Sequence, residues 1–152
     1  MNADDYFAIQ NLIHRYPYHL DRGELDQMAA LFAHADVHMG DRHVVRSNPA
    51  EVAQAFRDFL QVYPDGTPRT RHITSNLIIE ADGDNRAKAS SYVMVFQQTK
   101  ALPLQPIIGG DYHDRFEKVD GVWRFCERRI GNDLFGDLSA HGRYSFAPAM
   151  EF

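Results

Sequence analysis

The chain has 152 residues, of which 44% are hydrophobic and 24% charged, and this composition is typical of one globular domain. The net charge of −5 disfavours a nucleic-acid-binding surface, and no apolar run approaches the roughly 18 residues that span a membrane. The single cysteine, Cys126, cannot form an internal disulfide, and the N-terminus lacks the features of a secretory signal, so we expect a cytoplasmic protein.

The first part of the chain has the apolar spacing of helices. A first helix is predicted over residues 4–21, with Asp4 as its N-cap. Pro17 interrupts this pattern, so we expect a kink or a tightened last turn. A short second helix is predicted over residues 24–32. The clearest helix starts after Asn48, because this residue can cap it and the next residue is a proline.

The second half of the chain alternates like strands. Residues 35–45 predict one or two short strands between the helices. Residues 71–100 predict a hairpin that turns at DGDN, and residues 106–131 predict a second one that turns at VDGV. Helices followed by consecutive antiparallel strands indicate an α+β fold, in which helices pack on one side of a curved sheet. Residues 1–152 contain no repeat or linker and are predicted to form one domain.

The stretch RTRHITSN starts the first of these hairpins with a histidine. Because alternate residues of a strand share a face, His72, Thr74 and Asn76 are expected on one face. This polar face either lines a ligand site or forms a polar ladder in solvent. The apolar residues of the strand are expected on the other face: Ile73, Leu77 and Ile79.

Asp21 lies at the end of the first predicted helix, where its side chain can reach toward the sheet. It can equally be a solvated terminal acid or a helix cap, and His72 can be a satisfied histidine with no chemical role. If the two side chains meet, the carboxylate fixes the tautomer of the ring and stabilises the imidazolium. The second ring nitrogen is then free to take a proton from a substrate.

Three segments, IQNLIHRYPYHLD, TRHITSN and YHDRFEKVDGVWRF, resemble the SnoaL-like branch of the nuclear transport factor 2-like superfamily. The resemblance extends to the scytalone dehydratases and hexachlorocyclohexane dehydrochlorinases of that superfamily and spans residues 9–148. It implies a cystatin-like, cone-shaped, mostly antiparallel sheet that wraps around a pocket, with three helices in the N-terminal half. It also implies a homo-oligomer, with a trimer favoured, and no cofactor.

The resemblance further implies a catalytic dyad, in which His72 is the base and Asp21 orients it. Arg128 matches an arginine that assists the leaving group in the dehydrochlorinases. Tyr16 stands where those enzymes have a lysine. Because a tyrosine cannot supply a fixed positive charge, we expect loss of water rather than loss of halide.

Leu20 replaces a tyrosine that helps to activate the substrate carbonyl in scytalone dehydratases, so that mode of activation does not carry over directly. His113 is the nearest match to the second histidine of that site. Alternation leaves open whether Tyr112 or His113 points inward. Residues expected to bind substrate are Asn76, Tyr92, Met94, Phe56, Tyr112 and His113. Trp123 is expected in the core.

The stretch HADVHMGDRH contains three histidines and two aspartates, but no convincing spacing for three metal ligands, so we expect no metal site. The sequence has no Gly-rich phosphate loop. The pair Gly109–Gly110 predicts a bulge or bend in a curved sheet.

The sequence therefore predicts a cofactor-independent lyase that eliminates water from a small, mostly apolar and often cyclic organic molecule. An isomerase or cyclase with the same base is an alternative within enzymes. A ligand-binding module without catalysis is an alternative outside them, since fold alone does not give function. The apolar residues 144–152 are predicted to cover the pocket mouth or to contact a neighbouring subunit.

Overall fold

The computed structural model describes residues 1–40 and 43–144, and they form three helices and one six-stranded sheet. The helices are α1 (Ala3–Asp21), α2 (Leu25–Ala30) and α3 (Pro49–Phe59). The strands are β1 (Asp36–Met39), β2 (His43–Arg46), β3 (Thr70–Ala81), β4 (Arg86–Gln97), β5 (Gln105–Val119) and β6 (Val122–Phe135).

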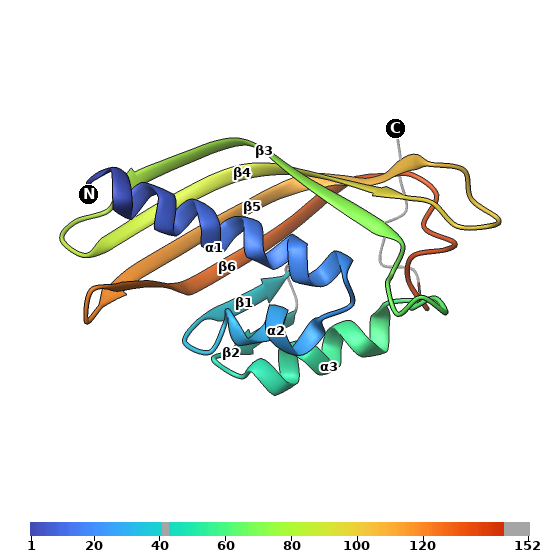
Figure 1. The fold of residues 1–152 in the computed structure, drawn as a ribbon, viewed down its shortest axis with the longest axis horizontal. Coiled ribbons are helices and arrows are strands. Elements are labelled where there is room, and N and C mark those ends of the chain that lie inside the picture. Colours follow the sequence, from blue (N-terminus) through green and yellow to red (C-terminus); the bar gives the residue numbers. More distant parts are fainter. Residues whose placement is uncertain (41–42, 145–152) are drawn as a thin grey trace.

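The strand order is β2-β1-β6-β5-β4-β3. Only β1 and β6 pair in parallel, and the other neighbouring strands are antiparallel. Helix α1 crosses one face of the sheet, whereas α2 and α3 lie beside β1 and β2 (Figure 1). The predicted α+β architecture and its three helices in the N-terminal half are confirmed.

Helix α1 starts one residue earlier than predicted, and Asn2 rather than Asp4 is its N-cap. Asn2 and Asp5 form a capping box, in which each side chain accepts a hydrogen bond of 2.9 Å from the backbone N–H of the other. The cap of α3 is as predicted, since the Asn48 side chain accepts from the backbone N–H of Glu51 at 3.3 Å.

Pro17 lies inside α1, and the helix continues to Asp21. The last turn is tightened, because Arg22 donates its backbone N–H to the carbonyl of His19 at 3.2 Å, three residues back. This tightened turn is one of the two outcomes that the proline predicts. It ends the helix with the Asp21 side chain facing β3.

Strand β3 contains a bulge that the sequence prediction missed. Its register against β4 shifts between Ser75 and Ile78, and Asn76 adopts a φ of 51°. The bulge moves Asn76 to the exposed side and turns Leu77 and Ile79 toward the core. The prediction that Asn76 shares the face of His72 is therefore wrong.

Both predicted hairpins are confirmed. The β5–β6 turn contains Asp120 and Gly121 with φ values of 50° and 81°, which matches the left-handed backbone of a tight type I′ turn. Gly109 and Gly110 mark a register shift of β5 against β6, as predicted. A Cβ atom on Gly110 would meet the Gly131 carbonyl oxygen at 2.0 Å, so only glycine allows this close approach.

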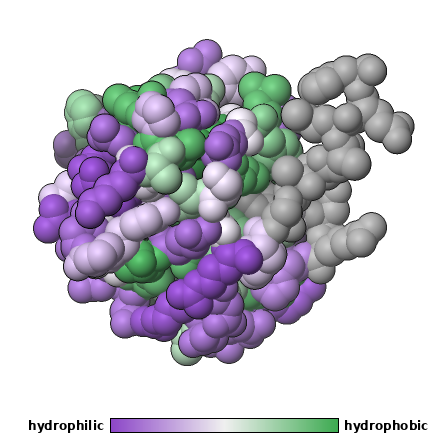
Figure 2. Space-filling model, turned by 90° about the vertical axis from the view of Figure 1, so that its right-hand side faces the viewer, coloured by the Kyte–Doolittle hydropathy of each residue, from purple (hydrophilic) through white to green (hydrophobic). Residues whose placement is uncertain are grey.

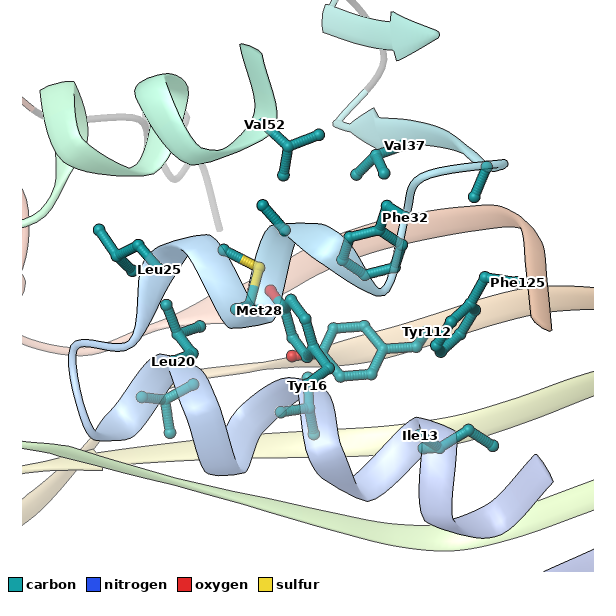
Figure 3. Close-up of a cluster of buried hydrophobic side chains, with 14 of the residues drawn as sticks. Ile13, Tyr16, Leu20, Leu25, Met28, Phe32, Val37, Val52, Tyr112 and Phe125 are labelled. Carbon is teal, nitrogen blue, oxygen red and sulfur yellow. The ribbon is translucent and has the colours of Figure 1, made fainter. Parts of the chain in front are cut away.

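The hydrophobic core lies between the helices and the inner face of the sheet (Figure 3). Its aromatic side chains stack against one another, and Phe32 packs on Phe125 with ring centroids 5.1 Å apart. Trp123 is buried, as predicted, and its indole N–H donates to the Asp5 carboxylate at 2.8 Å. The larger members of the core include Ile9, Ile13, Tyr16, Met28, Phe32, Phe116 and Phe125.

The surface is mixed in character. In the end view of Figure 2, hydrophobic patches lie between hydrophilic side chains. None of the helices in residues 1–40 and 43–144 is long and apolar enough to cross a membrane. Of the predicted C-terminal contact segment, residues 145–152 lie outside the described residues, and assembly as a homotrimer stays a prediction.

Candidate active site

A cavity of about 680 Å³ lies between the inner face of the sheet and helices α1 and α3. This volume is within the usual range for pockets that bind small organic molecules. Most of the lining is apolar, and a few polar side chains interrupt it. The lining residues that matter most for the chemistry are Tyr16, Leu20, Phe56, His72, Tyr112 and His141.

Asp21 and His72 meet at the wall of this cavity. His72 lies near the start of β3, directly beside the C-terminal end of α1. Its ring nitrogen Nδ1 is 2.6 Å from Asp21 Oδ1, and its backbone N–H donates to Asp21 Oδ2 at 2.8 Å. The Thr70 hydroxyl also donates to Asp21 Oδ1, at 2.7 Å. The carboxylate is thus held by three donors from one strand.

These contacts keep Asp21 ionised. Burial acts to raise the pKa of its carboxyl, but the hydrogen bonds from His72 and Thr70 outweigh burial and lower the pKa below its usual value. The ionised carboxylate accepts the proton of Nδ1 and so selects the tautomer with an unprotonated Nε2. Nε2 lies on the opposite edge of the ring, and the ring lines the cavity. The arrangement can therefore act as a base toward a bound molecule.

Two tyrosines add hydrogen-bond donors to the same cavity. The rings of Tyr16 and Tyr112 meet edge to face, with centroids 5.8 Å apart. Burial raises the pKa of Tyr16 to about 12 and raises the pKa of Tyr112 well above its usual value. Both hydroxyls consequently keep their protons at neutral pH. A hydrogen bond between the two side chains engages one of these protons, so the pair can donate the other to an oxygen of a ligand.

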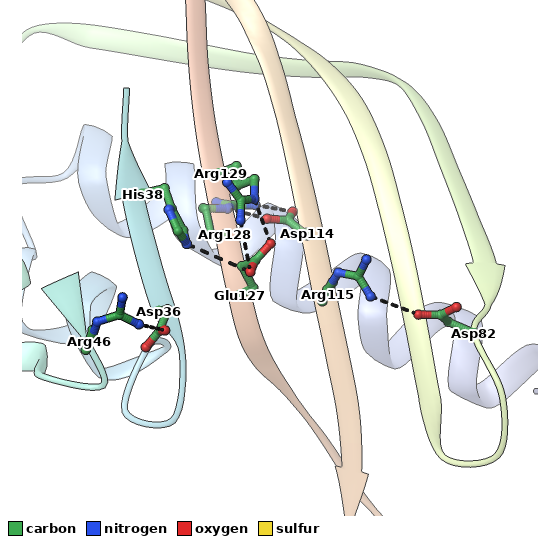
Figure 4. Close-up of polar contacts among 9 residues, drawn as sticks. All are labelled: Asp36, His38, Arg46, Asp82, Asp114, Arg115, Glu127, Arg128 and Arg129. Carbon is green, nitrogen blue, oxygen red and sulfur yellow. Dashed lines mark hydrogen bonds and ion pairs between the residues drawn. The ribbon is translucent and has the colours of Figure 1, made fainter. Parts of the chain in front are cut away.

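Arg128 lies behind the cavity wall and does not line it. Its side chain is completely buried and forms two hydrogen bonds with Asp114, from Nε at 2.7 Å and from Nη2 at 2.6 Å (Figure 4). The guanidinium also stacks on Tyr16 and Tyr112, at 4.4 and 4.5 Å from the ring centroids. Direct contact between Arg128 and a leaving group, as the resemblance implied, does not fit this position.

Alternation along β4 and β5 decides which other predicted residues reach the cavity. Tyr112 faces inward with Asp114, whereas His113 is exposed and lies 3.3 Å from Asp111 on the outer face. Tyr92 is 60% exposed, because its neighbours along β4 take the inward positions. Phe56 lines the cavity as predicted. Four of the predicted substrate-binding residues do not line it: Asn76, Tyr92, Met94 and His113.

His141 lines the cavity, and the sequence analysis missed it. It follows β6 in a segment without regular secondary structure, where periodicity gives no signal. Burial, and to a smaller extent the nearby His72, lower the pKa of its imidazole to about 4. His141 is therefore neutral at neutral pH. Within the described part of the chain, no three His, Cys, Asp or Glu side chains are arranged to hold a metal ion.

The sequence pattern of the SnoaL-like domain matches residues 1–129. The chain belongs to the SnoaL-like domain family. This match confirms the resemblance that the three sequence segments indicated. A search of curated protein sequences finds no match.

Solved structures share the fold of this SnoaL-like domain. A variant of Rv3472 from Mycobacterium tuberculosis, of unknown function, is 29% identical, with a TM-score of 0.70 over 87% of this chain and 78% of its own. A Nostoc punctiforme protein of unknown function with a cystatin-like fold is 24% identical, with a TM-score of 0.71 over 88% and 94%. A "Putative Scytalone Dehydratase" from Novosphingobium aromaticivorans is 25% identical, with a TM-score of 0.69 over 88% and 87%.

Proposed function

We propose that this SnoaL-like domain is a cofactor-independent lyase that removes water from a small cyclic hydroxy ketone. The observation that carries the proposal is the Asp21–His72 pair, in which Nδ1 is fixed 2.6 Å from a carboxylate while the ring lines a cavity. The structural similarity to the protein named "Putative Scytalone Dehydratase" adds support for dehydration.

In the proposed reaction, His72 Nε2 removes a proton from the carbon next to the substrate carbonyl. The electron pair of the broken C–H bond moves toward the carbonyl, whose oxygen gains negative charge. The Tyr16–Tyr112 pair donates a hydrogen bond to this oxygen, and a donor placed where charge develops lowers the barrier. Asp21 stabilises the imidazolium that forms on His72.

The second half of the reaction breaks the C–O bond of the substrate hydroxyl. The electron pair returns from the enolate to form a C=C bond, and the hydroxyl leaves with the proton that His72 Nε2 had taken. The products are an unsaturated ketone and one water, and the imidazole returns to its neutral form. Atoms and charges balance without a cofactor.

Arg128 has an indirect part in this proposal. Its guanidinium contacts the rings of Tyr16 and Tyr112 but not the cavity, so it fixes the two rings instead of binding the leaving group. Asp114 compensates its charge within the same wall. Arg128 is therefore a positioning residue for the two donors.

A binding module without catalysis explains the site less well. Burying the Asp21 carboxylate costs desolvation energy even though three donors surround it. This carboxylate would not increase the affinity for an apolar ligand, so binding alone does not explain its presence. An isomerase would use the same base, but its product would have the mass of the substrate. Product analysis therefore separates elimination from isomerisation.

The test is incubation of the protein with a panel of cyclic β-hydroxy ketones that have one or two rings, followed by mass spectrometry. We expect loss of water from at least one compound, and a decrease in rate of about 10²–10⁴-fold in His72→Gln. The exposed His14→Gln on α1 is the matched control and should retain the wild-type rate. A His72→Gln rate equal to that of the control would contradict the proposal, as would a panel in which no compound loses water.

A further inference from the structure

One ring nitrogen of His141, Nδ1, has no hydrogen-bond partner among the described residues. The side chain is only 5% exposed, and its Nδ1 is buried without a hydrogen bond. The ring lines the cavity that also contains His72, and its edge packs on Phe59 at a centroid distance of 5.4 Å. A buried imidazole without a partner costs free energy that a ring of the same shape without nitrogens would not cost. Packing alone therefore does not account for a histidine here.

The backbone around His141 has no regular secondary structure, but several hydrogen bonds anchor it to other parts of the chain. The Gln97 side chain, itself buried, donates to the Ala140 carbonyl at 2.9 Å, and the Tyr63 hydroxyl donates to the same oxygen at 2.7 Å. The backbone N–H of Gln61 donates to the His141 carbonyl at 2.9 Å. The Gln61 side chain donates to the carbonyls on either side, those of Ser139 and Gly142, at 3.0 and 2.8 Å.

All four consecutive carbonyls from residue 139 to residue 142 thus accept a hydrogen bond from a fixed donor. Such anchoring fixes the place of the side chain between them, as preorganised binding sites require. The segment presents one side chain to the cavity in this way, and that side chain is His141.

We infer that His141 contacts the substrate directly and selects molecules with a hydroxyl group in addition to the oxygen that Tyr16 and Tyr112 hold. The inference rests on the proposed function, since it names the substrate class of the same cavity. A hydroxyl fits because a neutral imidazole offers one donor and one acceptor, and a hydroxyl can pair with either. A carboxylate ligand would instead call for a charged partner, and the buried site disfavours charge on a second imidazole beside His72.

The test is equilibrium binding of ligands that cannot undergo elimination: naphthol and a set of dihydroxynaphthalene isomers. For the wild-type protein we expect at least one isomer to bind about five- to tenfold more tightly than naphthol, the value of one hydrogen bond. In His141→Phe, which keeps a ring against Phe59, this ratio should fall to about one. His141→Gln, which keeps a neutral donor and acceptor, should retain part of the preference.

Gln97→Met tests the anchoring of the segment, with the neighbouring exposed Gln98→Met as its control. The hydroxyl preference should decrease in the first variant and persist in the second. NMR shifts of the His141 ring nitrogens provide a second measurement on the wild-type protein, and they should change with the preferred isomer but not with naphthol. This measurement keeps the test decisive if His141→Phe does not fold.

An unchanged preference in His141→Phe would overturn the inference, as would ring nitrogens that do not respond to any isomer. A wild-type protein that binds no isomer more tightly than naphthol would also overturn it. None of these results depends on turnover. A protein that shows the His141-dependent preference but eliminates no water would contradict the proposed function and leave the role of His141 intact.

Discussion

Two buried carboxylates of this protein each hold a basic side chain, and one of these pairs lies at the cavity whereas the other lies behind its lining. Asp21 and His72 form the open pair, with side chains 9% and 8% exposed and the His72 ring in the cavity. Asp114 and Arg128 form the closed pair, with side chains 1% and 0% exposed. Both pairs have a shortest contact of 2.6 Å. The two pairs therefore differ not in the distance between their charged groups but in whether a molecule in the cavity can reach the basic side chain.

Access decides what each pair can do. The guanidinium of Arg128 keeps its proton under all ordinary conditions. Its Nε and Nη2 donate to Asp114, its Nη1 is buried with no hydrogen-bond partner among the described residues, and none of these atoms lines the cavity. The imidazole of His72 can gain and lose a proton within reach of a bound molecule. We expect the closed pair to control folding and the open pair to control chemistry, and the following variants test this division.

The largest effect on stability is expected from Asp114→Ala. It leaves the Arg128 charge buried without its partner, which typically costs about 3–5 kcal/mol. Urea denaturation followed by circular dichroism measures the free energy of unfolding. The double variant Asp114→Leu with Arg128→Met removes both charges and should regain much of this loss, because no uncompensated charge remains. A loss below about 1 kcal/mol in Asp114→Ala would show that the closed pair does not support the fold.

In contrast to Asp114→Ala, Asp21→Asn should have a small effect on stability and a large effect on activity. The amide oxygen can still accept from Thr70 or from the His72 backbone, so we expect a loss of stability of only about 1–3 kcal/mol. The elimination rate should fall by about 10²-fold or more, because an amide neither fixes the His72 tautomer nor stabilises the imidazolium. Steady-state rates and urea denaturation of the same preparation give both numbers. A rate that falls no more than the folded fraction does would remove Asp21 from the chemistry.

The open pair could be predicted from the sequence because Asp21 ends a helix and His72 starts a strand. Both positions follow from strong local signals, namely apolar spacing and turn residues. The family resemblance then gave the two residues a shared role. The hairpin turns and the Asn48 cap were predictable for the same local reason.

The failures arose where distant contacts decide the outcome. Alternation alone could not show whether Tyr112 or His113 faces inward, and the bulge at Asn76 reverses the expected face of β3. His141 depends on hydrogen bonds from Gln61 and Gln97, far away in the sequence, and such contacts have no periodic signature.

His141, in the cavity lining, should make the stability of the protein depend on pH. Its pKa is about 4 in the folded protein and about 6.5 in an unfolded chain, so between these values only the unfolded chain binds the proton. Stability should consequently fall by roughly 3 kcal/mol as the pH decreases from 6.5 to 4. Asp21 acts in a separate window: its lowered pKa contributes stability above about 3.8, and this contribution is lost only at lower pH. Urea denaturation across this range should give a flatter profile for His141→Phe than for the wild-type protein.

Tyr16 lies between the two pairs, because its ring contacts Arg128 while its side chain lines the cavity. Tyr16→Phe removes the hydroxyl and keeps the ring on the guanidinium. We expect the elimination rate to fall by about tenfold to a hundredfold, and the free energy of unfolding to change by less than about 1.5 kcal/mol. Tyr112→Phe is the matched comparison in the same cavity. If both variants retain the wild-type rate, the two hydroxyls do not stabilise the developing charge.

The smallest effect is expected where a carboxylate and an arginine meet in solvent. Asp82 and Arg115 are 3.1 Å apart with side chains 40% and 58% exposed (Figure 4). Water screens such a pair, so Asp82→Asn should change the free energy of unfolding by less than about 1 kcal/mol, and added salt should reduce this change further. Like the closed pair, this pair consists of an aspartate and an arginine, yet the loss of stability expected from breaking it is several times smaller. Urea denaturation could instead show that Asp82→Asn costs nearly as much stability as Asp114→Ala. Burial would then not explain why some ion pairs of this protein stabilise the fold and others do not.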